Sequence, residues 1–351
     1  MPLAPSFRSI LSITKKCLNC GGCARSIFGN TRCRNTGDLR SVLMTTAQSP
    51  ITGLRYIALA MPNFDESLEF YTTLWGLEQV SAGDGVAYLG SPVDPAQYIL
   101  RLRKAEAKRL DVVGLAAASR AEVDALGQRL SAAGVRIDRA PADLGTPGGG
   151  YGLRFFDCEG RLIEVSADVA PRKISGATQR GVPVNLGHVV FNTLTLEATK
   201  SFYETHLGLK LTDWLEDFMC FLRCNGAKHH ILAIAKGPHV ALNHVAYDMG
   251  GIDSQMRATG RLVRAGQKIV WGPGRHGAGD NTFSYFKDPA GNVCEFTAEM
   301  EGVDEANWKV RRWETKPEMQ DQWGTGGLIT DGMIPAQFNT PDTGLWTPAP
   351  V

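Results

Sequence analysis

The chain has 351 residues, of which 43% are hydrophobic and 21% are charged, and its 37 basic and 36 acidic side chains leave a net charge of +1. This composition is typical of a globular protein of one or two domains, and it does not favour a nucleic-acid or acidic-membrane partner. No run of about 18 apolar residues is present, so no membrane-spanning helix is expected.

Residues 1–43 differ from the rest of the chain. No acidic residue precedes Asp38, and four cysteines gather in this segment, namely Cys17, Cys20, Cys23 and Cys33. Three interpretations remain open: a translated leader upstream of a true start at Met44, a targeting or disordered leader, and an iron–sulfur or zinc site. We expect a disordered or mis-assigned leader over residues 1–50. The remaining cysteines are interpreted as buried free thiols of a cytoplasmic protein, namely Cys158, Cys220, Cys224 and Cys294.

An internal repeat organises the chain from Ile51 onward. Residues 53–77 read GLRYIALAMPNFDESLEFYTTLWGL, and residues 185–209 read NLGHVVFNTLTLEATKSFYETHLGL. Each segment predicts an apolar strand followed by an amphipathic helix, which ends at Gly76 or Gly208 because a left-handed residue is needed there. The ends of the repeats also match, as FFDCEGRLIEV (155–165) and YFKDPAGNVCEF (285–296), and each predicts a hairpin whose last strand contains a Glu.

A further strand–helix pair lies inside each repeat, as VVGLAAASRAEVDALGQRLSAAG in the first and NHVAYDMGGIDSQMRATGRLVRAG in the second. Each repeat is therefore predicted to contain two strand–helix–strands units. We place a first module at 51–170, a second module at 183–300 and a C-terminal lid and tail at 301–351. The segment between the modules contains Pro and Gly and is interpreted as a linker.

This layout resembles the vicinal oxygen chelate (glyoxalase/bleomycin resistance/dioxygenase) superfamily, and residues 51–325 resemble its type I extradiol ring-cleavage dioxygenases. The resemblance implies an α+β fold, in which each of two tandem modules pairs βαβββ units into a cupped, barrel-like mixed sheet. It also implies that the first module lacks the metal and that the chemistry is confined to the second.

Three residues of the second module fit a metal site with two imidazoles and one carboxylate. They are His188 in LGHVVF, His244 in LNHVAYD and Glu295 in GNVCEF. Such a triad occupies one face of an octahedral metal and leaves the opposite face open for a bidentate substrate and oxygen. A buried strand carboxylate such as Glu295 is costly unless a cation compensates its charge.

The first module serves as an internal control for this prediction. The counterpart of His188 is Tyr56, and the counterpart of His244 is Val112, or Val113 if the alignment slips by one. Of the three candidate ligands only the Glu is retained, as Glu164. The first module is therefore expected to be structural.

Further residues match positions that are functional in the family. The resemblance implies that His230 faces the oxygen site as an acid–base catalyst, and that His276 and Tyr285 hydrogen-bond the substrate oxygens and help their deprotonation. Trp271 stands where relatives that prefer an acidic side chain carry a basic residue, which favours a neutral or apolar substrate. The period of two along a strand predicts that His229, next to His230, faces solvent.

The implied reaction is iron(II)-dependent extradiol cleavage of a catechol-type diol, with insertion of both atoms of O2, in the degradation of aromatic compounds. Manganese(II) is the alternative metal. Two other functions remain open on the same fold: a metal-dependent glyoxalase-type isomerase or lyase, and a metal-free ligand-binding resistance protein.

The remaining expectations concern partners and the tail. We expect a small catecholic substrate, a homo-oligomer, a cytoplasmic location, and neither a nucleic-acid nor a membrane partner. The C-terminal segment is expected to close over the mouth of the site, and Arg311 and Arg312 are interpreted as a solvated basic turn. From Ile329 onward the tail lacks periodicity, and we expect it to be disordered.

Overall fold

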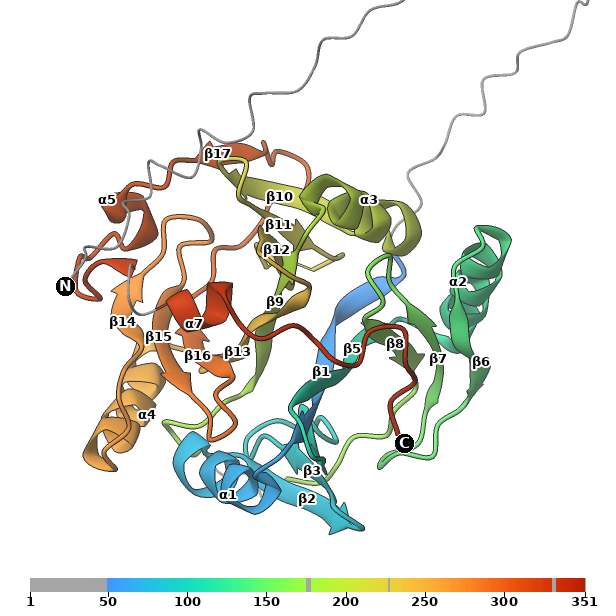
Figure 1. Cartoon of the computed structure of the whole chain (residues 1–351), viewed down its shortest axis with the longest axis horizontal. Coiled ribbons are helices and arrows are strands. Elements are labelled where there is room, and N and C mark those ends of the chain that lie inside the picture. The colour runs from blue at the N-terminus through green and yellow to red at the C-terminus, as the bar shows by residue number, and fades with distance from the viewer. Residues whose placement is uncertain (1–48, 175–177, 227, 330–332, 351) are drawn as a thin grey trace, which may run out of the picture. The chain divides into compact units, whose positions relative to one another are not determined.

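The computed structural model describes residues 49–174, 178–226, 228–329 and 333–350, so the expectations for residues 1–48, including the four cysteines there, lie outside the described residues. The described chain forms two mixed β-sheets, one from residues 51–167 and one from residues 185–313 (Figure 1). The predicted α+β architecture of two tandem modules is confirmed.

The first sheet has eight strands in the order β2-β3-β4-β1-β5-β8-β7-β6. The first strands of its two βαβββ units, β1 and β5, pair antiparallel at its centre, and each also pairs parallel with the last strand of its own unit. The elements are β1 (Ile51–Met61), α1 (Phe64–Glu69), its π-helical continuation η2 (Phe70–Trp75), β2 (Glu78–Gly83), β3 (Val86–Gly90), β4 (Leu100–Lys104), β5 (Arg109–Ala117), α2 (Arg120–Ala132), β6 (Ile137–Asp143), β7 (Tyr151–Phe156) and β8 (Leu162–Ala167).

The second sheet repeats this plan and adds one strand, giving the order β14-β15-β16-β13-β9-β12-β11-β10-β17. Its central pair is β9 and β13, and the added strand β17 pairs parallel with β10 at one edge. The elements are β9 (Asn185–Thr193), α3 (Leu196–Leu207), β10 (Lys210–Leu215), β11 (Met219–Arg223), β12 (Leu232–Lys236), β13 (Ala241–Asp248), α4 (Ile252–Arg264), β14 (Trp271–Arg275), β15 (Thr282–Lys287), β16 (Val293–Ala298), β17 (Arg311–Trp313), α5 (Pro317–Gln320) and α7 (Ile334–Gln337).

Both sheets are open. The first ends at β2 and β6 and the second ends at β14 and β17. The barrel-like arrangement therefore does not extend to closure. The central strands β1, β5, β9 and β13 are almost fully buried along most of their length, which is why they read as nearly continuous apolar runs.

The helices that carry the FY pair end as predicted. Gly76 follows η2 with φ +92°, and Gly208 follows α3 with φ +65°. A side chain at either position would be strained, since L-residues rarely adopt this left-handed conformation. No helix in the described ranges is long and apolar enough to cross a membrane.

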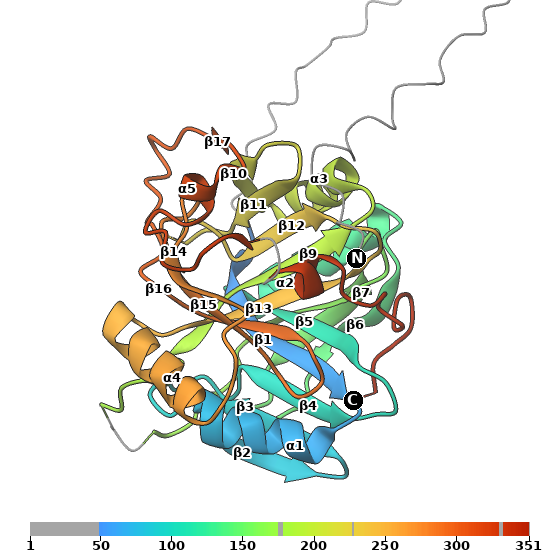
Figure 2. The same ribbon diagram turned by 60° about the vertical axis from the view of Figure 1, so that its left-hand side comes forward.

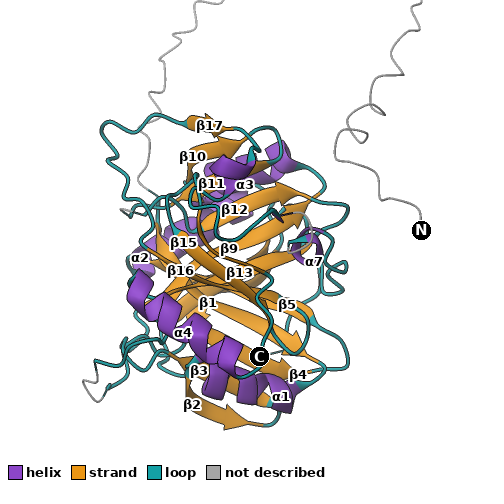
Figure 3. Ribbon diagram, turned by 90° about the vertical axis from the view of Figure 1, so that its left-hand side faces the viewer, coloured by secondary structure: helices purple, strands orange, loops and turns teal. Residues whose placement is uncertain are grey.

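The tyrosines of the FY pairs join the two modules reciprocally. Tyr71 of the first module donates to Asp288 of the second (3.0 Å), and Tyr203 of the second donates to Asp157 of the first (2.9 Å). Trp75 also stacks on Phe296 of the second sheet, with ring centroids 3.8 Å apart. In Figures 2 and 3, α1 accordingly lies beside α4 of the other module. The repeated Tyr therefore forms a hydrogen bond between the modules in both directions.

The tail differs from its expectation. Residues 333–350 run from the second sheet to the first, ending beside the strands of the first module (Figure 1). Asn339 donates to Leu242 O (2.7 Å) and accepts from Lys108 Nζ (2.6 Å), and Trp346 N donates to Gly160 O (2.8 Å). The prediction of disorder is wrong for these residues, because hydrogen bonds to distant strands and loops rather than a periodic apolar face hold them, and such bonds leave no pattern in the sequence.

The four described cysteines are free. Cys220, Cys224 and Cys294 are buried as expected, but Cys158 is exposed and the prediction for it is wrong. Cys158 lies in the tight turn between β7 and β8, where the chain reaches the surface to reverse direction.

Candidate metal centre

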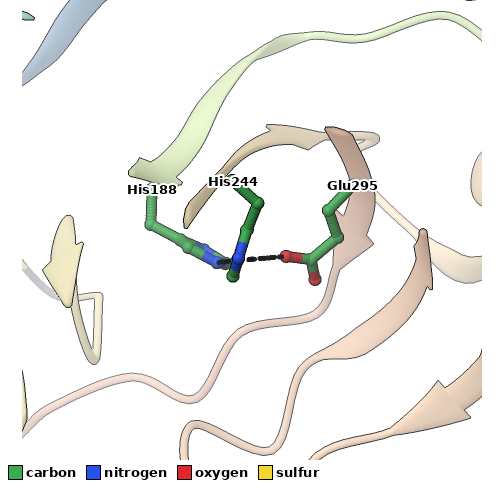
Figure 4. Close-up of side chains that lie close together, drawn as sticks. All are labelled: His188, His244 and Glu295. Carbon is green, nitrogen blue, oxygen red and sulfur yellow. Dashed lines mark hydrogen bonds and ion pairs between the residues drawn. The ribbon is translucent and has the colours of Figure 1, made fainter. Parts of the chain in front are cut away.

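The structure brings the three candidate ligands together on one buried face of the second sheet (Figure 4). They come from the adjacent strands β9, β13 and β16, where Ala246 of β13 pairs with both His188 and Glu295. Glu295 Oε2 lies 3.1 Å from His188 Nε2 and 3.3 Å from His244 Nε2, and the two imidazole nitrogens are 3.4 Å apart. Three donor atoms of the types that borderline divalent metals prefer therefore converge on one point.

The burial of Glu295 supports a cation at this point. Its side chain is 0% exposed, and neither carboxylate oxygen accepts a hydrogen bond from any residue in the described chain. A buried carboxylate that accepts no hydrogen bond is costly, and a divalent cation held by the three donors would compensate its charge. The residues present therefore fit a bound metal ion.

A hydrogen-bond chain orients His244. Its Nδ1 lies 2.7 Å from Asn243 Oδ1, and because this oxygen can only accept, Nδ1 carries the proton and Nε2 is left free for a metal. Asn243 Nδ2 donates to Asn192 Oδ1 (2.7 Å), and Asn192 Nδ2 donates to Ala336 O in α7 (2.8 Å). The tail thus anchors the orientation of a candidate ligand.

His276 and Tyr285 form a hydrogen-bonded pair, with His276 Nε2 3.0 Å from the Tyr285 hydroxyl. His276 Nδ1 lies 3.0 Å from Gln320 O, which can only accept, so Nδ1 carries the proton. Burial lowers the pKa of His276 to about 4, so its ring is neutral at pH 7 and Nε2 accepts from the hydroxyl. Burial, reinforced by Glu295, raises the pKa of Tyr285 well above its ordinary value. The pair is therefore a neutral acceptor beside a neutral donor.

This pair lies next to the candidate ligands, since the Tyr285 ring centroid is 5.2 Å from that of His244. The indole of Trp271 stacks on the Tyr285 ring, with the ring centroids 5.6 Å apart. Its centroid also lies 5.3 Å from that of His276. The indole N–H donates to Gly327 O (3.1 Å), and the side chain is 4% exposed. Trp271 therefore supports the pair, and its contact with a substrate remains a prediction.

His230 also reaches the site, with its ring centroid 4.4 Å from that of His188. Burial, followed by the neighbouring histidines, lowers its pKa well below the ordinary value. His229 does not face solvent as predicted. It is 0% exposed and lies 2.9 Å from His230, Nδ1 to Nδ1. The period of two failed because both residues precede β12 and lie outside a regular strand.

Strand register settles the comparison with the first module. Tyr56 pairs with Gly114 as His188 pairs with Ala246, so the counterpart of His244 is Val112 and not Val113. Likewise Glu164 pairs with Gly114 as Glu295 pairs with Ala246. The equivalent of His230 is Tyr98, two residues before Leu100, which pairs as Leu232 does.

An arginine occupies the place of the cation in the first module. Arg154 pairs with Glu164 as Tyr285 pairs with Glu295, and its Nε donates to Glu164 Oε2 at 2.8 Å. Both side chains are buried, at 3% and 0% exposure. Burial, followed by Glu164, raises the pKa of Tyr56 well above its ordinary value, so this side chain stays neutral. The guanidinium therefore compensates the charge of the retained carboxylate.

Several residues of the site escaped the sequence analysis. Asn243 lies at a register shift of β13, and Asp111 lies at the same shift of β5. A comparison of the repeats could have found this shared irregularity. Asp213, whose Oδ2 lies 3.0 Å from His229 Nε2, and Asn192 carry no such signal, because their contacts join segments far apart in the chain.

Comparisons with known proteins give a family and several relatives. A family model described as the Glyoxalase/Bleomycin resistance protein/Dioxygenase superfamily matches residues 53–165 and 185–296. The structure of the Mn(II)-bound glyoxalase from Novosphingobium aromaticivorans is 42% identical, covers 86% of this chain and 99% of that one, and has a TM-score of 0.81.

Two curated relatives carry dioxygenase names. Metapyrocatechase 2 of Cupriavidus necator is 28% identical over 218 residues, which is 56% of this chain and 67% of that protein. The iron-dependent extradiol dioxygenase of Rhodococcus jostii is 27% identical over 284 residues, which is 74% of this chain and 93% of that protein.

Proposed function

Because the chain belongs to the glyoxalase/bleomycin resistance protein/dioxygenase superfamily, we propose that it is an extradiol dioxygenase, which opens the ring of a catechol-type diol and inserts both atoms of O2. One observation carries the proposal. The buried, uncompensated carboxylate of Glu295 converges with two imidazoles, and His230, His276 and Tyr285 adjoin this point. The names of two curated relatives support the same reaction.

The metal would be held by His188, His244 and Glu295. When bound, it supplies Lewis acidity toward the diol and the capacity to activate O2. We propose iron(II), with manganese(II) as the alternative, because one relative is named iron-dependent and one similar structure is named Mn(II)-bound.

The residues around the metal would move protons and exclude water. Tyr285 donates to His276 Nε2, so a proton that the diol releases on binding would reach this nitrogen through the Tyr285 hydroxyl. His230 stands beside His188 and would return a proton to the oxygen that is reduced during ring opening. His230 and Tyr285 are buried and His276 is partly buried, which strengthens their electrostatic interactions with the substrate.

The substrate is proposed to carry a neutral or apolar substituent. Trp271 contributes an apolar ring beside Tyr285, and the nearby Arg275 is paired with Asp280 and Glu299. A paired guanidinium is less available to an anionic substituent. An aryl- or alkyl-catechol from aromatic degradation fits this environment better than an acidic one.

The division of labour between modules belongs to the same proposal, with a structural module at 51–170, a catalytic module at 183–300 and a lid and tail at 301–351. We further propose a cytoplasmic homo-oligomer that acts on a small molecule and binds neither nucleic acid nor membrane. The free thiols of Cys220 and Cys294 are compatible with a reducing compartment.

A glyoxalase-type isomerisation is the second candidate, favoured by the name of the 42% identical structure. Such a reaction needs a metal but no O2. A site built from both modules is disfavoured because Tyr56 and the Arg154–Glu164 pair stand at the equivalent positions of the first module.

The deciding experiment measures O2 consumption. Purified full-length protein is loaded with iron(II) under anaerobic conditions and mixed with a panel of substituted catechols before O2 is admitted. We expect one O2 consumed per catechol and a yellow product that absorbs visible light. Conversion of a hemithioacetal without O2 consumption, and no reaction with any catechol, would contradict the proposal and favour the isomerase.

Metal removal gives a further prediction. Chelation followed by gel filtration should abolish ring cleavage, and iron(II) should restore it, because the carboxylate and imidazoles offer no alternative Lewis acid. Parallel reconstitution with manganese(II), followed by metal analysis and kinetics, distinguishes the two ions. Full activity in protein shown to contain no transition metal would contradict the metal assignment.

The orientation of His244 can be tested separately. Asn243→Ala removes the acceptor that holds Nδ1, and metal affinity should fall about 10–100-fold, as is typical when a partner of a metal-bound His is lost. Competition with a fluorescent chelator measures the affinity. Asn225→Ala, which removes a partly buried hydrogen bond to Ser49 O elsewhere, is the matched control and should leave metal affinity unchanged.

A further inference from the structure

A buried chain of three polar side chains leads away from His230. His230 Nδ1 lies 2.9 Å from His229 Nδ1, and His229 Nε2 lies 3.0 Å from Asp213 Oδ2. The three residues are 2%, 0% and 0% exposed. None of the reaction steps proposed above uses His229 or Asp213, although burying them is costly unless their groups are satisfied.

Asp213 is an ionised acceptor at the end of this chain. Burial raises the pKa of its carboxyl, but hydrogen bonds from His229, Arg311 and Trp313 together hold the pKa below its ordinary value. Arg311 donates through both its backbone N and its side-chain Nε (each 2.9 Å), and the Trp313 indole donates at 2.7 Å. Arg311, expected in a solvated basic turn, instead fixes this carboxylate from strand β17.

The donors and acceptors can be ordered from this carboxylate. Since Asp213 only accepts, His229 Nε2 carries a proton. The Nδ1 of a neutral His229 is then an acceptor, so the hydrogen bond between the two imidazoles requires the proton on His230 Nδ1. His230 Nε2 is left with a free lone pair, and it makes no hydrogen bond to any residue that the structure describes.

We propose that Asp213 and His229 are positioning residues, which fix the tautomer of His230 so that an unprotonated Nε2 faces the metal centre. The tautomer follows from the hydrogen bonds of His229, whereas its consequence for catalysis rests on the proposed function. His230 would then take up a proton at Nε2, and His229 and Asp213 would hold the ring in place as it becomes charged. A buried carboxylate can fix the tautomer of a neighbouring catalytic His in this way.

The first module again provides an internal control. Ser81 follows the register shift of β2 as Asp213 follows that of β10, and it is exposed. Gln97 and Tyr98 precede β4 as His229 and His230 precede β12. No carboxylate or imidazole therefore stands at these positions in the module that also lacks the two candidate His ligands.

Nitrogen chemical shifts test the tautomer directly. The full-length chain is labelled with ¹⁵N-histidine, freed of metal, and its ring nitrogens are observed by long-range ¹H–¹⁵N NMR, with His230→Asn used to assign the signals. We expect His230 to be protonated at Nδ1 and not at Nε2. A His230 ring protonated at Nε2 overturns the proposal, whatever reaction the enzyme catalyses.

A pair of variants separates positioning from packing. His229→Gln retains an amide oxygen that can accept from His230 and an amide N–H that can donate to Asp213, whereas His229→Phe retains neither. With the iron-loaded enzyme, kcat for catechol cleavage should fall about 100-fold or more in the Phe variant, in the range typical of general acid–base catalysis. The kcat of the Gln variant should stay within about 10-fold of wild type, because the Gln side chain would preserve the tautomer of His230.

The Michaelis constant for catechol should change little in either variant, since residue 229 bonds to His230 and Asp213 and not to a candidate metal ligand. His206→Phe, on α3 and packed against Phe202, is the control histidine. Equal losses in the Gln and Phe variants, or no loss in the Phe variant, would overturn the positioning role.

Discussion

Glu295→Gln is expected to abolish ring cleavage while leaving the metal-free protein folded. The variant removes the anionic ligand of the metal. A metal stabilises the transition state by several kcal/mol, so its loss corresponds to a fall of about 10³-fold or more in kcat/KM. Steady-state kinetics after iron(II) loading, with metal analysis of the same samples, checks the result. Retention of both tightly bound metal and activity would contradict the assignment of Glu295 as a ligand.

The same variant should not destabilise the metal-free chain at pH 8.5. The Glu295 carboxylate is fully buried and accepts no hydrogen bond from a described residue, so without a bound cation its charge is poorly compensated. Replacing it with a neutral amide should raise the free energy of unfolding on the order of 1 kcal/mol. Urea unfolding monitored by tryptophan fluorescence measures the change. In the metal-loaded wild type the order reverses, because bound metal stabilises the folded state.

Glu164→Gln is the matched control at the equivalent position of the first module. Glu164 is paired with Arg154, so its neutralisation should destabilise the protein by about 3 kcal/mol. Activity of the folded protein should be unchanged, since this carboxylate belongs to the module without a proposed metal. At equivalent register positions, Glu295→Gln should therefore abolish activity without destabilising the metal-free protein. Glu164→Gln should destabilise the protein without changing its activity.

The repeat explains why so much of the fold was predictable. Each βαβββ unit has a strand followed by a helix that ends at a glycine, and each module closes with a hairpin whose last strand contains a Glu. The same signals therefore recur along the chain. The convergence of His188, His244 and Glu295 could be expected because three chemically suited residues occupy strands that the repeat places side by side. Tyr285 and His276 were found only through family resemblance, as neither residue type by itself implies a site.

What escaped prediction depends on contacts between distant segments. His229 precedes a strand rather than lying within one, so alternation could not place it, and its partner Asp213 comes 16 residues earlier. The anchor of Asn192 is a carbonyl in α7, 144 residues away. The tail is held by hydrogen bonds to residues far away in the chain, such as those of Asn339 to Leu242 and Lys108. Local patterns therefore fix elements and faces, whereas the hydrogen bonds that orient each catalytic group require coordinates.

Arg154 illustrates the same limit, because its residue type alone suggests a surface charge. The structure instead buries it against Glu164, where the second module has Tyr285 against Glu295. A buried pair of this kind is a weak source of net stability, although breaking it is costly. The first module should therefore keep its stability if both members of the pair persist or both are replaced, and lose stability if only one is replaced.

Arg154→Met is accordingly expected to destabilise the protein by about 3–5 kcal/mol, since it leaves Glu164 buried and unpaired. The double variant Arg154→Met/Glu164→Gln removes both charges and should return to within about 1 kcal/mol of wild type. Urea unfolding of the four proteins in the cycle gives the coupling energy between the two residues.

An exposed arginine provides the control for this cycle. Arg120 pairs with Asp143 and Asp168, but its side chain is 51% exposed. Arg120→Met should leave the free energy of unfolding nearly unchanged, as is typical of surface ion pairs. A cost for Arg154→Met as small as that for Arg120→Met would mean that water or a cation reaches Glu164 when the guanidinium is absent. A double variant as unstable as the single variant would mean that Arg154 acts through packing, and its role as the substitute for a metal would then be wrong.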